Sequence, residues 1–135
     1  MNKRLPASNW RSRSINDWNT TTFTKYLEDR HRELFGVDYV PYRSWRVEQG
    51  LIANIIGTTT GSKPQKYPPK VLKRFIDECF ADYRPSAKYP GISFGFMWTY
   101  RKNVWQRVIA EYEREEQRKV VEENRPSDEE IRAWF

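Results

Sequence analysis

The side chains best suited to chemistry in this sequence are cations beside aromatic rings, a combination typical of polyanion binding. Residues 1–19 combine Trp10 with Arg11 and Arg13 among small polar residues. Flexible basic segments can follow a phosphate backbone, and an indole ring can stack on an unpaired base. We therefore predict that residues 1–19 form a basic, flexible arm that contacts nucleic acid. The alternative is that Trp10 and Ile15 dock on the core and that the cations are solvated.

A second group of cations lies near the middle of the chain. Residues 58–68 read as a loop that contains Gly61 and Pro64, and the helix predicted to follow has cations on its first turns. Cations at a helix N-terminus oppose the helix dipole, so an external anion would explain them better than helix stability does. The predicted nucleic-acid contacts in this region are Lys63, Lys66, Lys70, Lys73 and Arg74.

The C-terminal residues 125–135 have a different chemistry, with acids followed by apolar groups. Arg125 and Pro126 break the chain, and Ser127 with Glu130 fits a capping box that opens one last helical turn. Aromatic rings can fill a pocket on a partner while acids meet its basic rim. The predicted partner-binding residues are Asp128, Glu129, Glu130, Ile131, Trp134 and Phe135. The alternative is that Trp134 and Phe135 fold back on their own core.

No set of residues in the sequence resembles a catalytic site. Neither a glycine-rich phosphate loop nor a nucleophile elbow is present, and the single histidine and single cysteine lie in unrelated segments. One His and one Cys are also too few to hold zinc. We therefore predict no enzymatic activity, no cofactor, no metal and no small-molecule substrate. His31 is expected to be structural or exposed, and Cys79 to be a small buried apolar residue.

Composition and charge indicate a single small domain. The chain has 135 residues, 16% of them aromatic, and a net charge of +6 that divides into +10 for residues 1–110 and −4 for residues 111–135. This division suits a protein that holds a polyanion with its body and a protein partner with its end. The sequence lacks a long apolar run and the apolar centre of a signal peptide. We therefore expect no membrane association and a cytoplasmic location.

Helical periodicity predicts three short helices and one long one. The short helices are expected at residues 23–35, 45–56 and 70–83, and the long one runs from residue 94 to residue 124 without a break. The predicted N-caps lie within residues 20–22, at Ser44 and at Ser93. Gly36 and Gly57 end the first two helices, and residues 37–43 form an extended connector.

The fold class that follows is all-α, with three short helices packed on the N-terminal half of a long fourth helix and a short C-terminal helical turn. Trp98 and Trp105 should lie on one side of the long helix, and Gly50 should mark a close approach between helices. The domain organisation is a basic flexible arm (1–19), a helical core (20–110), a charged helical extension (111–124) and an acidic-aromatic tail (125–135).

Two stretches carry a resemblance to a known group of proteins. KRFIDECFADYRPSAKYPGISFGFMWTYRKNV and FTKYLEDRHRELFGVDYVP resemble small accessory proteins of tailed bacteriophages that act in phage DNA replication or transcription, over roughly residues 23–110. The tail, Asp128 to Phe135, is similar in kind to the C-terminal peptides by which single-strand-binding proteins and phage late-transcription coactivators engage partners. The body shows no alternating strands that would build the barrel of a single-strand-binding protein.

Charge placement and this resemblance together predict a non-enzymatic DNA-binding accessory or adaptor protein, in the bacterial host cytoplasm if phage-encoded. Its partners would be DNA, either single- or double-stranded, and a protein of the replication or transcription machinery. The alternative is a pure protein adaptor, an inhibitor or coactivator of a host polymerase or replication protein, that does not bind DNA.

Overall fold

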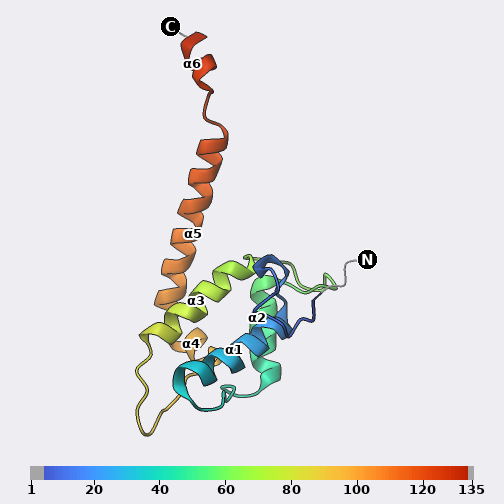
Figure 1. Ribbon diagram of the computed structural model, residues 1–135, viewed down its shortest axis with the longest axis vertical. Coiled ribbons are helices and arrows are strands. Elements are labelled where there is room, and N and C mark those ends of the chain that lie inside the picture. The colour runs from blue at the N-terminus through green and yellow to red at the C-terminus, as the bar shows by residue number, and fades with distance from the viewer. Residues whose placement is uncertain (1–4, 134–135) are drawn as a thin grey trace.

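The computed structural model describes residues 5–133, and its regular elements over that range are all helical. Figure 1 shows a body built from the first helices, from which most of the fifth projects as a rod with the sixth at its far end. The elements in chain order are η1 (Ile15–Asp17), α1 (Thr20–Phe35), α2 (Trp45–Ile56), α3 (Pro69–Asp82), α4 (Phe94–Tyr100), α5 (Lys102–Glu123) and α6 (Asp128–Ala133).

Local capping residues explain where most of these helices begin and end. The predicted caps Ser44 and Ser93 are confirmed, since each side chain accepts a hydrogen bond from the backbone N–H three residues later, at 3.2 Å. The cap of α1 is Asn19 rather than a residue within 20–22. The Asn19 side chain accepts from the N–H of Thr22, and Thr22 Oγ1 accepts from the N–H of Asn19. Gly36, with φ of 72°, ends α1 as predicted.

The predicted unbroken helix over residues 94–124 is wrong, because the chain bends at Arg101. This residue has φ of −120° and ψ of 33°, and it separates α4 from α5. Seven residues of straight helix would rise by about 10 Å. The bend instead brings the rings of Trp98 and Trp105 to 5.2 Å from each other, and both contact Phe75 of α3, at 6.2 and 5.4 Å. Shared packing on one α3 ring therefore accounts for the break.

Helix α3 occupies the middle of the core. Its apolar stripe is buried as predicted, and the helix packs against α2, α4, α5 and η1. Cys79 within the stripe is fully buried. By contrast, α5 buries only Val104, Trp105 and Val108, all in its first two turns. The core is thus organised around α3, and the rest of α5 contributes little apolar surface to it.

Residues 5–19 pack against the body, which is the alternative to the predicted arm. Trp18 is only 6% exposed, and Trp10 and Ile15 lie against the core cluster. The ring of Trp10 meets that of Tyr26 edge to face at 4.8 Å. Burial of the Trp18 indole and partial burial of the Trp10 indole offset the entropy lost by ordering this segment, so a solvated arm is not the arrangement observed for residues 5–19.

Over residues 5–133, no helix combines the length and the apolar character needed to cross a membrane.

Candidate functional site

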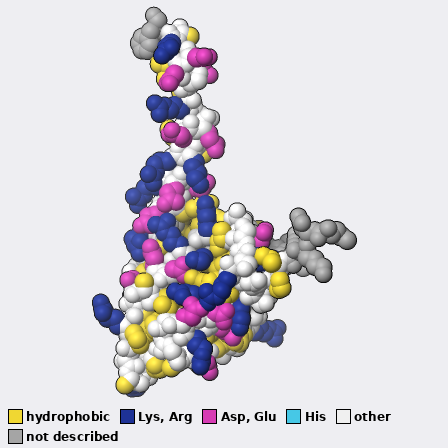
Figure 2. All heavy atoms as spheres, viewed as in Figure 1, with side chains coloured by type: hydrophobic (Ala, Val, Ile, Leu, Met, Phe, Trp, Pro, Cys, Tyr) yellow, Lys and Arg dark blue, Asp and Glu magenta, His cyan; other side chains and the backbone are white. Residues whose placement is uncertain are grey.

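The cations of α3 that were predicted to bind an external anion contact the protein's own carboxylates. Arg74 forms ion pairs with Glu111 and with Glu115, both on α5. A further ion pair joins the same two helices, with the guanidinium of Arg107 on α5 2.7 Å from a carboxylate oxygen of Glu78 on α3. The hydrogen bond from Arg107 and the charge of Arg74 hold the pKa of Glu111 below its usual value. Figure 2 shows Lys and Arg intermixed with Asp and Glu along this junction.

The two lysines of α3 are also close to acids. Lys73 lies 2.7 Å from Asp77 one turn later, and its ammonium group lies over the ring of Tyr26 at 5.2 Å. Lys70 is 3.9 Å from Glu116 on the rod. The cations at the start of α3 therefore lie beside carboxylates, which α5 supplies for Lys70 and Arg74 and α3 itself supplies for Lys73. The local positive charge that favoured a nucleic-acid surface here is largely balanced.

The predicted contacts at the start of the chain are also engaged within the protein. Trp10 donates a hydrogen bond from its indole N–H to Asp29 at 2.8 Å. The guanidinium of Arg11 stacks over the Trp10 ring at 4.2 Å and pairs with Glu33. A partly buried ring with these contacts does not present a free face to an unpaired base.

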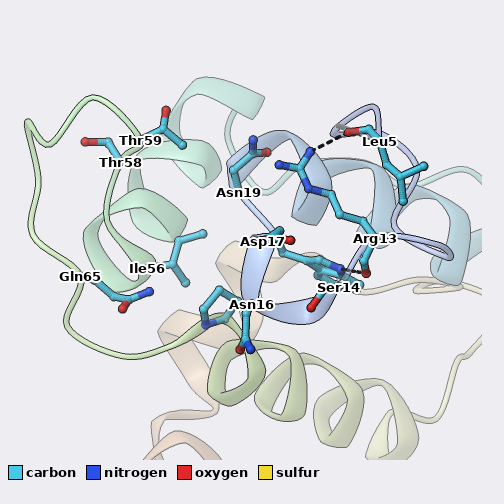
Figure 3. Close-up of a pocket in the computed structure, with 12 residues that line it drawn as sticks. Leu5, Arg13, Ser14, Asn16, Asp17, Asn19, Ile56, Thr58, Thr59 and Gln65 are labelled. Atoms are coloured by element: carbon cyan, nitrogen blue, oxygen red, sulfur yellow. Dashed lines mark hydrogen bonds between the residues drawn. The ribbon is translucent and has the colours of Figure 1, made fainter. Parts of the chain in front are cut away.

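Arg13 and the loop 58–68 are brought together at a polar cleft of about 360 Å³. Within residues 5–133, no carboxylate lies within 4.0 Å of the cationic groups of Arg13, Lys63 or Lys66. Figure 3 shows Arg13 on one side of the cleft and the side chains of the loop on the other. The polar side chains that line the cleft include one acid, Asp17, and also Arg13, Asn16, Asn19, Thr58, Thr59 and Gln65.

A large, mainly apolar cavity lies at the opposite end of the body from the rod. Its volume is about 980 Å³, and its two walls are residues 37–42 and 83–93. We call it the apolar groove. Figure 1 places both wall segments at the lower end of the body, where Figure 2 shows hydrophobic side chains at the surface. Its apolar lining comprises Val37, Val40, Pro41, Tyr42, Tyr83, Tyr89, Pro90, Ile92 and Phe96.

Much of this apolar lining faces solvent. Val40 is 73% exposed, and Tyr42, Tyr89 and Phe96 are also among the exposed large hydrophobic residues. Exposed apolar surface gathered in one concave place is typical of binding sites, whereas isolated exposed apolar residues are common everywhere. The groove is therefore the strongest candidate for a site of recognition.

His31 joins the two walls of the groove from beneath. Its Nδ1 lies 3.0 Å from the carbonyl oxygen of Val37, and its Nε2 accepts a hydrogen bond from the N–H of Ile92 at 3.1 Å. Since Nε2 accepts, Nδ1 carries the proton and donates a hydrogen bond to the carbonyl oxygen of Val37. A Cβ at Gly91 would overlap the imidazole, so only glycine allows this close approach. The expectation that His31 is structural is confirmed.

A buried carboxylate fixes the wall on the other side. Glu48 of α2 is fully buried and accepts hydrogen bonds from the N–H groups of Tyr42 and Gly95, both at 2.9 Å, and from the Tyr39 hydroxyl. The hydroxyl of Tyr39 in turn accepts from the N–H of Phe94 at 2.7 Å. Burial first, and then the Glu48 carboxylate, raise the pKa of Tyr39, which keeps the phenol protonated as the donor. These bonds tie the wall at Tyr42 to the start of α4.

Glycine contacts differ from the sequence prediction. Gly50 was expected to mark a close approach between helices, but a Cβ there would meet nothing within 4 Å. The close approach is at Gly95 instead, where a Cβ would lie 2.5 Å from the Cβ of Tyr42. Gly95 therefore permits the contact between α4 and the groove wall.

The groove was not predicted from the sequence, although two signals were present. Val40, Pro41 and Tyr42 are apolar residues in a connector that belongs to no helix. Apolar groups in a loop must either dock on the core or stay at the surface, and the choice depends on segments distant in sequence. A second signal was Glu48, an acid within a mostly apolar helix.

The C-terminal residues lie at the far end of the rod. One of the two hydrogen bonds of the predicted capping box is present, since the Ser127 Oγ accepts from the N–H of Glu130 at 3.2 Å. Asp128, Glu129 and Glu130 are exposed and Ile131 is half-buried. Trp134 and Phe135, the remaining predicted partner-binding residues, lie outside the described residues.

The single cysteine of the chain is buried. Burial raises the pKa of the Cys79 thiol to about 12, so it stays protonated and unreactive at neutral pH. Residues 5–133 contain no cluster of three His, Cys, Asp or Glu side chains placed to hold a metal ion.

Comparison with protein-family models gave no match, and comparison with curated proteins and with solved structures gave no significant match. We therefore infer function from the geometry of the chain itself.

Proposed function

We propose that this chain is a non-enzymatic adaptor that binds a protein partner in the apolar groove. The observation that carries the proposal is a concave, mainly apolar surface of about 980 Å³ whose walls are held by buried hydrogen bonds. A site already shaped in the free protein loses little entropy when its partner binds. Large side chains such as Val40 and Tyr89 stay exposed on its walls and would be covered by the partner.

A protein segment fits the groove better than a nucleic acid does. Nucleic-acid affinity comes mainly from cations that neutralise phosphates. Only two of the residues that line the groove are Lys or Arg, namely Arg84 and Lys88. The apolar side chains instead favour a partner that inserts apolar or aromatic anchors and carries acids toward these two cations.

Selection from a displayed library of random peptides tests this function. Peptides that combine apolar anchors with acids should be enriched on the full chain. Their binding should fall at least tenfold in the variant Val40→Asp, because a charge in the groove must be desolvated to accept them. Val121→Asp is the matched control, since Val121 on the rod is 69% exposed, close to the 73% of Val40. Equal binding by the two variants, or no enrichment, would rule out the groove as the binding site.

A second candidate function, DNA binding, is favoured by one observation. Arg13 and the loop that carries Lys63 and Lys66 meet at the polar cleft, and these three cations have no carboxylate within 4.0 Å among the described residues. The amide and hydroxyl groups of the cleft could supply further contacts to phosphate or sugar.

Binding to duplex and single-stranded DNA across a salt series tests this candidate. Changing Lys63 and Lys66 to Ala should reduce the slope of log K against log salt on duplex by about 0.9 per lost phosphate contact. The matched pair Lys70→Ala and Lys73→Ala should change it little, because these lysines face acids of the protein. A larger effect from the changes at Lys70 and Lys73 would identify α3 as the DNA-binding surface. Absence of binding by the unaltered chain at low salt would refute DNA binding.

A further inference from the structure

We propose that the occupant of the apolar groove is the acidic C-terminal segment of a second copy of this chain, so that copies associate head to tail. This inference rests on the proposed function, because it names the partner of the same groove. The segment is α6, Asp128–Ala133, and the sequence continues into Trp134 and Phe135, which lie outside the described residues.

Charge on the two surfaces is complementary. Arg84 and Lys88 line the groove, and within residues 5–133 neither has a carboxylate within 4.0 Å. One acid, Asp38, also lines it, but its charge is offset by an ion pair with Arg32. The segment brings three consecutive exposed acids, Asp128 to Glu130, and one cation, Arg132. Acids opposite unpaired cations steer association and set its orientation.

Apolar groups on the two surfaces are complementary as well. The groove exposes aliphatic and aromatic side chains that nothing in the described chain covers. The segment supplies Ile131 and Ala133 after its acids. Figure 1 shows α6 apart from the body, and Ile131 on it is only half-buried, so part of its apolar surface is open to a partner. Burying it between the groove walls would remove apolar area of both copies from water.

The segment cannot enter the groove of its own chain. Helix α5 has 22 residues, which corresponds to a length of about 33 Å. It carries α6 away from the body, and Figure 1 shows α6 and the groove walls at opposite ends of the molecule. The exposed part of the rod is charged along most of its surface, and its exposed apolar residues, Val120 and Val121, lie on the rod far from the groove. The C-terminal segment of another copy is not tethered in this way and can reach the groove.

The contact between copies would join two different surfaces. One contact leaves a free groove on one copy and a free tail on the other, so further copies can add. A short segment in one groove buries less area than a standard stable interface, which indicates weak, concentration-dependent association. The expected assembly is therefore a distribution of sizes that grows with protein concentration.

Sedimentation velocity on the full chain tests the inference. The mean mass should rise with concentration between about 1 µM and 1 mM, the range expected for a small and partly charged interface. High salt should weaken the association, because its ion pairs lie at the surface. Two variants interrupt the two surfaces separately, namely Val40→Asp in the groove and Ile131→Asp in the tail. Each should be monomeric alone, and Val121→Asp on the rod should behave like the unaltered chain.

Mixing the two monomeric variants gives the decisive result. The Ile131→Asp chain keeps an intact groove and the Val40→Asp chain keeps an intact tail, so an equimolar mixture should form a 1:1 complex and nothing larger. Lys88→Glu serves as a second groove variant should Val40→Asp fail to fold, with unchanged circular dichroism as the check. A mixture that stays monomeric while the unaltered chain associates would overturn the proposal and place the contact elsewhere.

The outcome also separates this inference from the proposed function. An unaltered chain that stays monomeric up to about 1 mM, a concentration at which even weak millimolar contacts would be seen, contradicts the self-association. Peptide selection by the groove would then show that the groove binds another protein, whereas failure of both experiments would remove the proposed function as well.

Discussion

Replacing Glu48 with Ala tests whether one buried carboxylate holds the groove in shape. Glu48 is fully buried and accepts hydrogen bonds from the N–H groups of Tyr42 and Gly95 and from the hydroxyl of Tyr39. All of these partners are donors, and removal of the carboxylate leaves them without an acceptor. The variant should therefore lose both global stability and the attachment of the groove wall to α4.

The size of the effect follows from the number of donors left unsatisfied. Each buried donor without a partner costs about 1 to 3 kcal/mol, and effects of groups in one network do not simply add. For the three donors at Glu48 we expect a loss of about 4 kcal/mol in the free energy of unfolding, a large part of the 5 to 15 kcal/mol typical of a domain. Glu48→Gln keeps one oxygen as an acceptor and should lose about 1 to 2 kcal/mol.

Urea unfolding, followed by circular dichroism and by tryptophan fluorescence, measures these differences. Glu113→Ala is the control, because Glu113 is exposed on the rod and its removal should change stability by less than about 0.5 kcal/mol. Hydrogen exchange at the amides of Tyr42 and Gly95 should accelerate in Glu48→Ala. A loss below about 1 kcal/mol, or unchanged exchange, would show that other contacts hold the wall.

Three further substitutions test the packing. Gly50→Ala should stabilise the chain by about 0.5 to 1 kcal/mol, because alanine favours a helix and nothing lies within 4 Å of the new Cβ. Gly95→Ala should destabilise it by about 1 to 3 kcal/mol through overpacking against Tyr42. Equal signs for the two, in the same denaturation assay, would refute this assignment. Trp105→Ala should cost about 3 to 5 kcal/mol, since Trp105 is 8% exposed and packs on Phe75, and a loss under about 1 kcal/mol would contradict its place in the core.

The charged side chains show most clearly which contacts could not be predicted from the sequence. The cations at the start of α3 do oppose its dipole, so an anion beside them was a sound expectation. Arg74 has a local partner, Glu78, one turn later, but it also pairs with Glu111, 37 positions later in the chain. No local pattern reveals such a pairing, because it depends on how α5 crosses α3.

The break at Arg101 has the same origin. Nothing in the residues around Arg101 resembles a helix stop, since no Gly or Pro stands at that point. The bend exists because Trp98 and Trp105 both pack on Phe75, a residue of another helix. Periodicity alone therefore predicts one helix where packing makes two.

The sequence by itself determined the all-helical class, the caps at Ser44 and Ser93 and the buried stripe of α3. These features depend on residues within about four positions of one another, and helical periodicity and capping express such local interactions directly. Only the tertiary structure decided the apolar groove. Its walls come from residues 37–42 and 83–93, and His31 and Glu48 hold them by hydrogen bonds to Ile92 and Gly95 that span 61 and 47 positions. Contacts over such separations form only when the whole core has packed.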